Sequence, residues 1–229
     1  MTNLQSHFFN ERKIKLMNNN LTEMIFILDR SGSMAGLESD TIGGFNSMLE
    51  RQKKEEGEAY VSTILFNHNS TVIHDRVSID KVEPLTREQY FAAGTTALMD
   101  AMGDAIHHIK NVHKYAREED RPAHTIMVII TDGMENASRR YSSDSIKATV
   151  KKRTEEGWEF IFLGANIDAV ETASDYGIKP ERAANFHNDN RGIHTNFTVL
   201  GDICGSVRKG TPLPECCLAE ISSDFKSRK

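Results

Sequence analysis

Three stretches of the chain are almost continuously apolar and end in polar residues: 23–29, 124–131 and 158–163. A short apolar run bounded by turn-forming residues is typical of a strand that is covered on both faces. Two further runs, 59–66 and 71–79, flank a four-residue turn, and this spacing predicts a hairpin. One edge strand of the sheet is therefore expected to be antiparallel.

Apolar residues between the strands recur at helical spacing. The longest stripe runs from Leu98 to Val112 and predicts a helix over 96–116, which Pro122 keeps from continuing. Further elements are expected as helices from residue 40, over 143–156, over 168–176 and from Ile193 to Val207, and as a short strand over 183–186. Helices that alternate with strands predict an α/β fold with a doubly wound, mostly parallel central sheet, one antiparallel edge strand and helices on both faces.

The 229 residues fit a single domain, and the hydrophobic fraction of 38% is that of a soluble globular protein. Segment 1–20 has no periodic apolar face and is predicted to be an N-terminal tail, within which Met17 is an alternative start. Residues 21–208 are predicted to form the domain, and 209–229 a polar C-terminal tail.

Charge and hydropathy narrow the range of partners. The net charge of −5 argues against nucleic acid, which favours a basic surface. No apolar run approaches the ~20 residues that cross a bilayer, and the first residues lack the apolar stretch of a signal peptide. The three cysteines, two of them the neighbours Cys216 and Cys217, make a poor disulfide framework. We therefore expect reduced thiols, a cytoplasmic location and no membrane partner.

Polar side chains gather where the predicted strands end. Asp29, Ser31 and Ser33 follow the first strand, Asp132 follows the strand after Pro122, and Thr96 opens the longest helix. In an open parallel sheet, ligands bind outside the carboxyl ends of the strands. Two carboxylates held close together are costly, and a hard cation removes that cost. Carboxylate and hydroxyl oxygens favour Mg²⁺, Mn²⁺ or Ca²⁺ over zinc, and a sparse site that keeps waters suits Mg²⁺.

These three motifs, DRSGS, GTTALMDAM and VIITDG, resemble the metal-ion-dependent adhesion site (MIDAS) of von Willebrand factor A (vWA) domains, over roughly residues 23–208. The resemblance implies a Rossmann-like fold with the first strand beside the strand after Pro122. It also implies direct coordination by the two serines and a threonine, with the aspartates binding directly or through water. The T-A-L-x-D-A continuation assigns the threonine as Thr96, with Thr95 as the alternative. A partner protein is then expected to supply an Asp or Glu to the metal.

Other interpretations of the same residues are weaker. Asp, Ser and Gly also favour turns, but turn formation does not explain three motifs at the ends of elements. The chain has no GxGxxG, no GxxxxGK[ST], no GxSxG and no DxDxT motif, which argues against nucleotide sites, a hydrolase elbow and an aspartyl-phosphate phosphatase. His107, His108 and His113 lack the four-residue spacing of a helical metal clamp and are expected to be solvated.

The function predicted from the sequence is that of a divalent-metal-dependent protein-binding module without catalysis. Two alternatives stay open at this point. One is a hydrolase that uses metal-activated water, for which the sequence offers no clear general base beyond the ligands. The other is a metal that only stabilises the fold.

Overall fold

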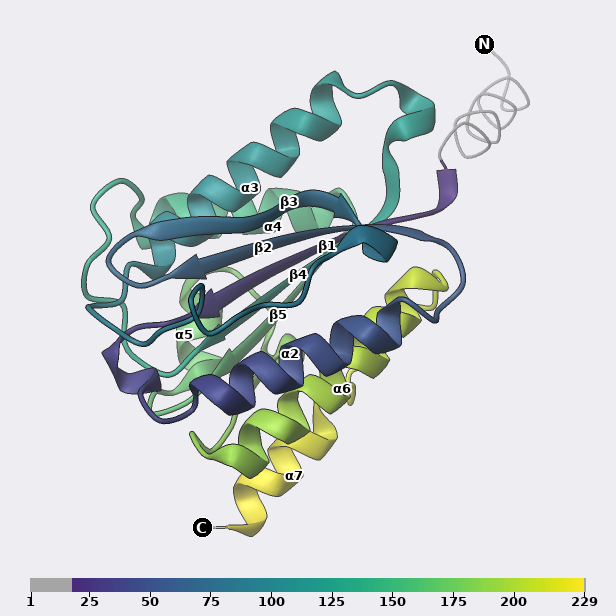
Figure 1. Ribbon diagram of the computed structural model, residues 1–229. Coiled ribbons are helices and arrows are strands. Elements are labelled where there is room, and N and C mark those ends of the chain that lie inside the picture. Colours follow the sequence, from purple (N-terminus) through teal and green to yellow (C-terminus); the bar gives the residue numbers. More distant parts are fainter. Residues whose placement is uncertain (1–17, 229) are drawn as a thin grey trace.

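Within residues 18–228, which the computed structural model describes, six strands form one sheet with helices on both faces (Figure 1). The strands are β1 (Asn18–Asp29), β2 (Glu58–Phe66), β3 (Ser70–Ser78), β4 (Pro122–Thr131), β5 (Trp158–Gly164) and β6 (Ala183–Asn185). The α-helices are α2 (Glu38–Gln52), α3 (Leu98–Tyr115), α4 (Ser143–Glu155), α5 (Ala169–Asp175), α6 (Asn190–Arg208) and α7 (Ala219–Ser227). Four short 3-10 helices complete them: η1 (Gly32–Met34), η2 (Ile79–Lys81), η3 (Glu118–Asp120) and η4 (Pro180–Arg182).

The strand order is β3-β2-β1-β4-β5-β6, and every neighbouring pair is parallel except β2 with β3. The predicted α/β fold with one antiparallel edge strand is therefore confirmed. The chain leaves β1 toward one edge of the sheet and returns at β4 to build the other edge. This reversal places the loops after β1 and β4 side by side, which is the position where open α/β sheets hold ligands.

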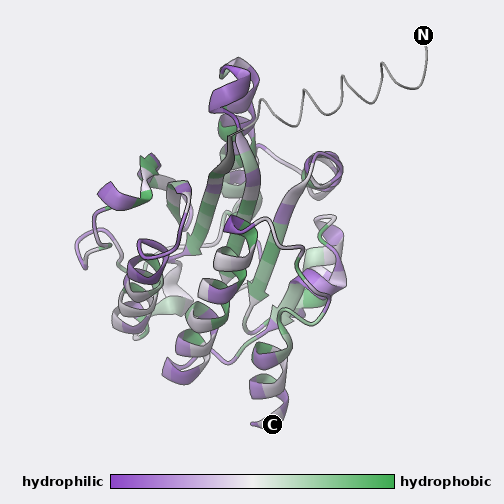
Figure 2. Ribbon diagram, turned by 90° about the vertical axis from the view of Figure 1, so that its right-hand side faces the viewer, coloured by the Kyte–Doolittle hydropathy of each residue, from purple (hydrophilic) through white to green (hydrophobic). Residues whose placement is uncertain are grey.

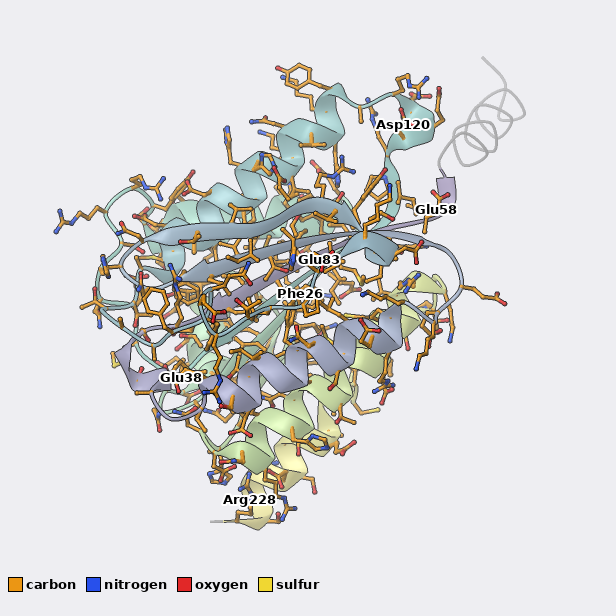
Figure 3. All side chains as sticks on the ribbon, in the orientation of Figure 1. Phe26, Glu38, Glu58, Glu83, Asp120 and Arg228 are labelled. Carbon is orange, nitrogen blue, oxygen red and sulfur yellow. The ribbon has the colours of Figure 1, made fainter. Side chains whose placement is uncertain are left out.

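Two apolar layers hold the helices to the sheet. Along β1, Phe26 and Leu28 face the layer under α2, α6 and α7, whereas Ile25 and Ile27 face the layer under α3, α4 and α5. Each of these side chains is at most 1% exposed, so each contributes roughly 1.5–3 kcal/mol by burial. Figure 2 shows the same division, with hydrophobic strands inside and hydrophilic helix faces outside. Phe26, labelled in Figure 3, packs edge-on against Phe45 of α2 at 5.3 Å between ring centroids.

The two predicted tails differ from the structure. β1 begins at Asn18, so residues 18–20 belong to the sheet, while the rest of the predicted N-terminal tail, Met17 included, lies outside the described residues. The C-terminal segment contains α7 and is not a polar tail. Its apolar residues Leu213, Leu218 and Ile221 are buried against the core. They are too few and too unevenly spaced to form the long stripe by which the other helices were predicted.

A buried ion network lies on β1 toward its amino end. Glu23 is fully buried, and its Oε2 accepts hydrogen bonds from Arg76 Nε at 2.8 Å and pairs with His113 Nε2 at 3.2 Å. The imidazole of His113 also packs edge-on against Trp158 at 5.6 Å. The prediction that His113 is a solvated helix residue is therefore wrong, because its side chain is only 16% exposed.

Candidate metal centre

The loop after β1 is held by a hydrogen bond to Asp29, the last residue of the strand. Asp29 ends the strand, and its Oδ1 accepts the backbone N–H of Ser31 at 2.7 Å. η1 then turns the chain so that the hydroxyls of Ser31 and Ser33 share a hydrogen bond of 3.2 Å. Asp29 and Ser31 are each 1% exposed, whereas Ser33 is exposed, so this loop carries a row of oxygens from the interior to the surface.

The loop after β4 meets this row. Asp132 follows the last residue of β4, and its Oδ1 accepts a hydrogen bond of 2.6 Å from Ser33 Oγ. The two residues are 99 positions apart in the chain, and they meet because β1 and β4 are parallel neighbours in the sheet. Asp132 is 1% exposed, so the site holds two buried carboxyl groups.

Thr96 brings a third hydroxyl to the site. A Cβ added at Gly133 would lie 3.5 Å from Ser33 Oγ and 3.7 Å from Thr96 Oγ1, so these two hydroxyls flank the same glycine. Asn136 fixes the threonine backbone by accepting the Thr96 N–H at 3.0 Å on Oδ1 and donating its own N–H to the Thr96 carbonyl at 3.0 Å. Thr96 is buried, whereas its neighbour Thr95 is exposed. The structure thus brings all five predicted residues together, with Thr96 turned inward.

Burial makes both carboxylates costly to ionise. Desolvation raises the pKa of Asp29 above its usual value, against the opposing effect of hydrogen bonds from Thr131 and Ser31. Desolvation also raises the pKa of Asp132, and the nearby charge of Asp29 raises it further. Every hydrogen bond that the described residues donate to these carboxylates comes from a neutral group, namely a backbone N–H, a hydroxyl or an amide. Within residues 18–228, no cationic side chain forms a hydrogen bond or ion pair with either carboxylate.

Two residues that the sequence did not single out complete the hydrogen bonds of the carboxylates. Thr131, the last residue of β4, donates its hydroxyl to Asp29 Oδ2 at 2.7 Å. Asn188, in the connection between β6 and α6, donates its amide to Asp132 Oδ2 at 3.0 Å. Thr131 directly precedes Asp132, so its place at the strand end was a usable signal. Nothing in the local sequence marks Asn188.

The connection before α3 supports the loop from outside. The phenol of Tyr90, which is almost fully buried, donates to the backbone carbonyl of Asp29. Arg30 points away from the carboxylates and donates to the Gln89 carbonyl at 2.9 Å, with its guanidinium 4.9 Å from the centre of the Phe91 ring. These contacts fix the backbone that carries Asp29 and the two serines.

The oxygen spacing fits a small divalent ion. Neighbouring oxygens of the row lie 2.6 and 3.2 Å apart. Oxygens that coordinate Mg²⁺ at its usual 2.0–2.1 Å in an octahedron lie about 3.0 Å apart. Within residues 18–228 no group of three or more His, Cys, Asp or Glu could hold a metal, so a site here depends on two carboxylates and three hydroxyls. That donor set suits a hard cation better than zinc.

Residues 23–195 match the protein family described as the von Willebrand factor type A domain. The chain belongs to this family. No curated protein matches it. The match runs from within β1 to the first part of α6, and it therefore includes the vWA loops that carry all five candidate residues.

Solved structures share this fold at low sequence identity. Proximal thread matrix protein 1 from the mussel byssus, with a zinc-occupied MIDAS motif, is 16% identical with a TM-score of 0.54, and the match covers 80% of this chain and 46% of that one. A vWA protein from Catenulispora acidiphila is 10% identical with a TM-score of 0.51, covering 79% and 42%. Manganese-loaded TRAP from Plasmodium vivax is 13% identical with a TM-score of 0.51, covering 78% and 74%. This vWA chain spans less than half the length of the first two proteins.

A cavity of about 760 Å³ lies beside the segment that carries Thr96 of this vWA domain. Its lining includes Thr95 and Ala97 on either side of Thr96, and the side chains of His68 and Arg139. Thr95 and Ala97 therefore face this cavity, while the hydroxyl of Thr96 between them is turned toward the interior. No helix among the described residues is both long and apolar enough to cross a membrane.

Proposed function

We propose that this vWA domain binds a partner protein through a divalent metal held by five residues. These are Asp29, Ser31, Ser33, Thr96 and Asp132. The metal in the cell is Mg²⁺, and Mn²⁺ or Ca²⁺ can take its place. Support comes from one observation, which is that two buried carboxylates with raised pKa values share a row of hydroxyl oxygens and receive only neutral donors.

The five residues of the site contribute either a negative charge or a neutral oxygen. Asp29 and Asp132 supply two negative charges, which match the charge of one divalent ion, while Ser31, Ser33 and Thr96 supply neutral oxygens. The ion, when bound, offers a Lewis-acidic position to one more oxygen ligand. Because Ser33 is exposed, that position is reachable from outside, and the favoured ligand is an Asp or Glu carboxylate of the partner.

The comparisons support a divalent ion in general. The mussel protein carries zinc in its MIDAS motif and the Plasmodium protein is loaded with manganese, so related folds hold divalent metals of different kinds. The open cavity beside Thr96 offers space for the residues that flank the partner's carboxylate. Neither nucleic acid nor a membrane is part of the proposal, and the cytoplasmic location stays a prediction.

A hydrolase is the weaker proposal because two acids in the segments around Thr96 are already engaged in hydrogen bonds. Glu135 accepts the backbone N–H groups of Met99 and Ala137 at 2.9 and 2.8 Å. Asp100 accepts those of Arg139 and Arg140 at 3.1 and 2.9 Å, and these bonds lower its pKa against the effect of burial. Carboxylates held in this way are poorly placed to take a proton from water.

The adjacent threonines provide a matched test. We expect Thr96→Ala to lose most of the Mg²⁺ affinity, because it removes an inward hydroxyl, and Thr95→Ala to leave that affinity within about twofold, since an exposed side chain contributes little. Isothermal titration of both variants and the wild type with Mg²⁺, Mn²⁺ and Ca²⁺ measures the difference. Wild-type protein that binds none of the three ions would refute the metal site.

Partner capture separates docking from a structural metal. Immobilised domain is incubated with native lysate in Mg²⁺ or in EDTA, and Thr96→Ala and Thr95→Ala are run beside it. Docking through the metal requires a protein that is retained in Mg²⁺ by the wild type and by Thr95→Ala, and that is lost in EDTA and with Thr96→Ala. Capture that is the same in all four conditions would leave the metal with a structural role.

A further inference from the structure

Asn188 reaches the candidate metal centre from a part of the chain that none of the three motifs includes. It lies three residues after β6 and two before α6. Its amide nitrogen donates to Asp132 Oδ2 at 3.0 Å and lies 3.5 Å from the backbone carbonyl of Ser33. One side chain therefore touches both loops of the site, the one after β1 and the one after β4.

This contact fixes the orientation of the Asp132 carboxylate. Ser33 holds Oδ1 and Asn188 holds Oδ2, so neither oxygen is free to rotate out of place. The amide of Asn188 has only one sensible orientation, because turning it over would set its oxygen against the carboxylate. In this orientation Asn188 Oδ1 is buried and has no hydrogen-bond partner among the described residues. A buried acceptor without a donor is costly, and a water held next to Asp132 would satisfy it.

The C-terminal helix holds the residues on either side of Asn188. His187 Nε2 lies 3.0 Å from the carbonyl oxygen of Phe225, and the two rings are 4.6 Å apart. On the other side, Asp189 caps α6 through Oδ1 and forms an ion pair of 2.6 Å through Oδ2 with Arg228. Arg228 directly follows α7 and is labelled there in Figure 3. Contacts with α7 and with Arg228 directly after it therefore hold the residues on both sides of Asn188.

We infer that Asn188 is a positioning residue for the metal centre and that α7 holds it in place. The inference rests on the proposed function. Asn188 acts through Asp132, whose carboxylate it orients by donating to Oδ2 while Ser33 donates to Oδ1. Groups that orient metal ligands in this way typically change metal affinity 10–100-fold when they are removed.

The first experiment compares two asparagines of the same segment. Asn188→Ala removes the contact, and Asn190→Ala, at the exposed first residue of α6, is the matched control. Titration calorimetry with Mg²⁺ is run at a temperature at which circular dichroism shows every variant to be folded. We expect the Mg²⁺ Kd of Asn188→Ala to rise at least ~10-fold, and that of Asn190→Ala to stay within about twofold.

Melting in EDTA separates positioning from a structural role. If Asn188 only stabilised the fold, Asn188→Ala would lower the metal-free melting temperature and leave the Mg²⁺ Kd unchanged, which would overturn the inference. Wild-type protein that binds no Mg²⁺ would instead refute the proposed function itself. Wild-type binding together with equal binding by Asn188→Ala would refute only the role of Asn188.

A second pair of variants tests the part played by α7. Arg228→Ala breaks the ion pair with Asp189, and Lys226→Ala changes an exposed residue of the same helix. We expect a smaller rise in Mg²⁺ Kd for Arg228→Ala, about threefold, because His187 still holds the segment, and none for Lys226→Ala. An unchanged Kd in Arg228→Ala would show that α7 does not position Asn188.

Discussion

Asp132→Asn separates the charge of the metal centre from its hydrogen bonds. Asp132 accepts from Ser33 Oγ at 2.6 Å and from the amide of Asn188 at 3.0 Å. An asparagine has the same shape, and its oxygen can accept from Asn188 while its amide donates to the Ser33 hydroxyl, which accepts as readily as it donates. Both contacts therefore survive in the variant, and only the charge is lost.

The direction of the effect follows from the raised pKa. Burial and the charge of Asp29 raise the pKa of Asp132, so ionising it destabilises the metal-free fold by about 1.4 kcal/mol for each unit of the rise. We therefore expect Asp132→Asn without metal to be more stable than the wild type and to melt at a higher temperature. Mg²⁺ at a hundred times its Kd should stabilise the wild type by about 2.7 kcal/mol, or roughly 5–10 °C, and the variant not at all.

The order of the two melting temperatures should therefore reverse with metal. The assay is thermal unfolding at pH 7 in EDTA and across a Mg²⁺ titration, with the exposed Asp80→Asn as a control for the loss of one negative charge. Should Asp132→Asn melt below the wild type in EDTA, the charge of Asp132 must stabilise the metal-free fold, and the reasoning from its raised pKa would be wrong.

Three further predictions concern pH and stability. The pKa values of Asp29 and Asp132 are raised in the folded protein above 3.8, their ordinary value. As the pH falls from neutral toward 3.8, these carboxylates therefore bind protons in the folded protein before they do so in the unfolded chain. Relative to the double Asn variant, the metal-free wild type should gain stability over that range in urea titrations, whereas with Mg²⁺ it should lose stability, since the ligands must be deprotonated. Arg76→Ala should cost about 3–5 kcal/mol in the same urea assay, because it leaves Glu23 as a buried charge with a weaker partner; a loss below 1 kcal/mol would contradict this. Ile221→Ala should cost about 2–5 kcal/mol in a single cooperative transition, and a separate early transition would show that α7 unfolds alone.

The sequence predicted those parts of the site that lie at the ends of strongly patterned elements. Asp29 and Asp132 follow apolar runs long enough to be recognised as buried strands, and the resemblance to vWA domains placed those strands together. Thr96 could be preferred over Thr95 because of the motif that follows it, and the structure turns Thr96 inward and leaves Thr95 exposed.

The missed features depend on contacts between residues far apart in the chain. Asn188 lies 56 residues from Asp132, and no periodic pattern connects the two positions. His113 was expected to be solvated because its own helix suggested nothing else, yet it pairs with Glu23, 90 residues away. A charged residue at the start of an apolar strand was a signal that this position needs a partner, but the identity of the partner is set by the packing of α3 and β3 around β1.

Strand β1 carries a buried charge in each half. Glu23 and Asp29 are six residues apart, which is about 20 Å along an extended strand. At that separation two unit charges interact by only about 0.8 kcal/mol at an effective dielectric constant of about 20. Loops at the carboxyl edge can therefore be exchanged, by evolution or by design, to suit a new partner while the ion network at the other end keeps the scaffold intact.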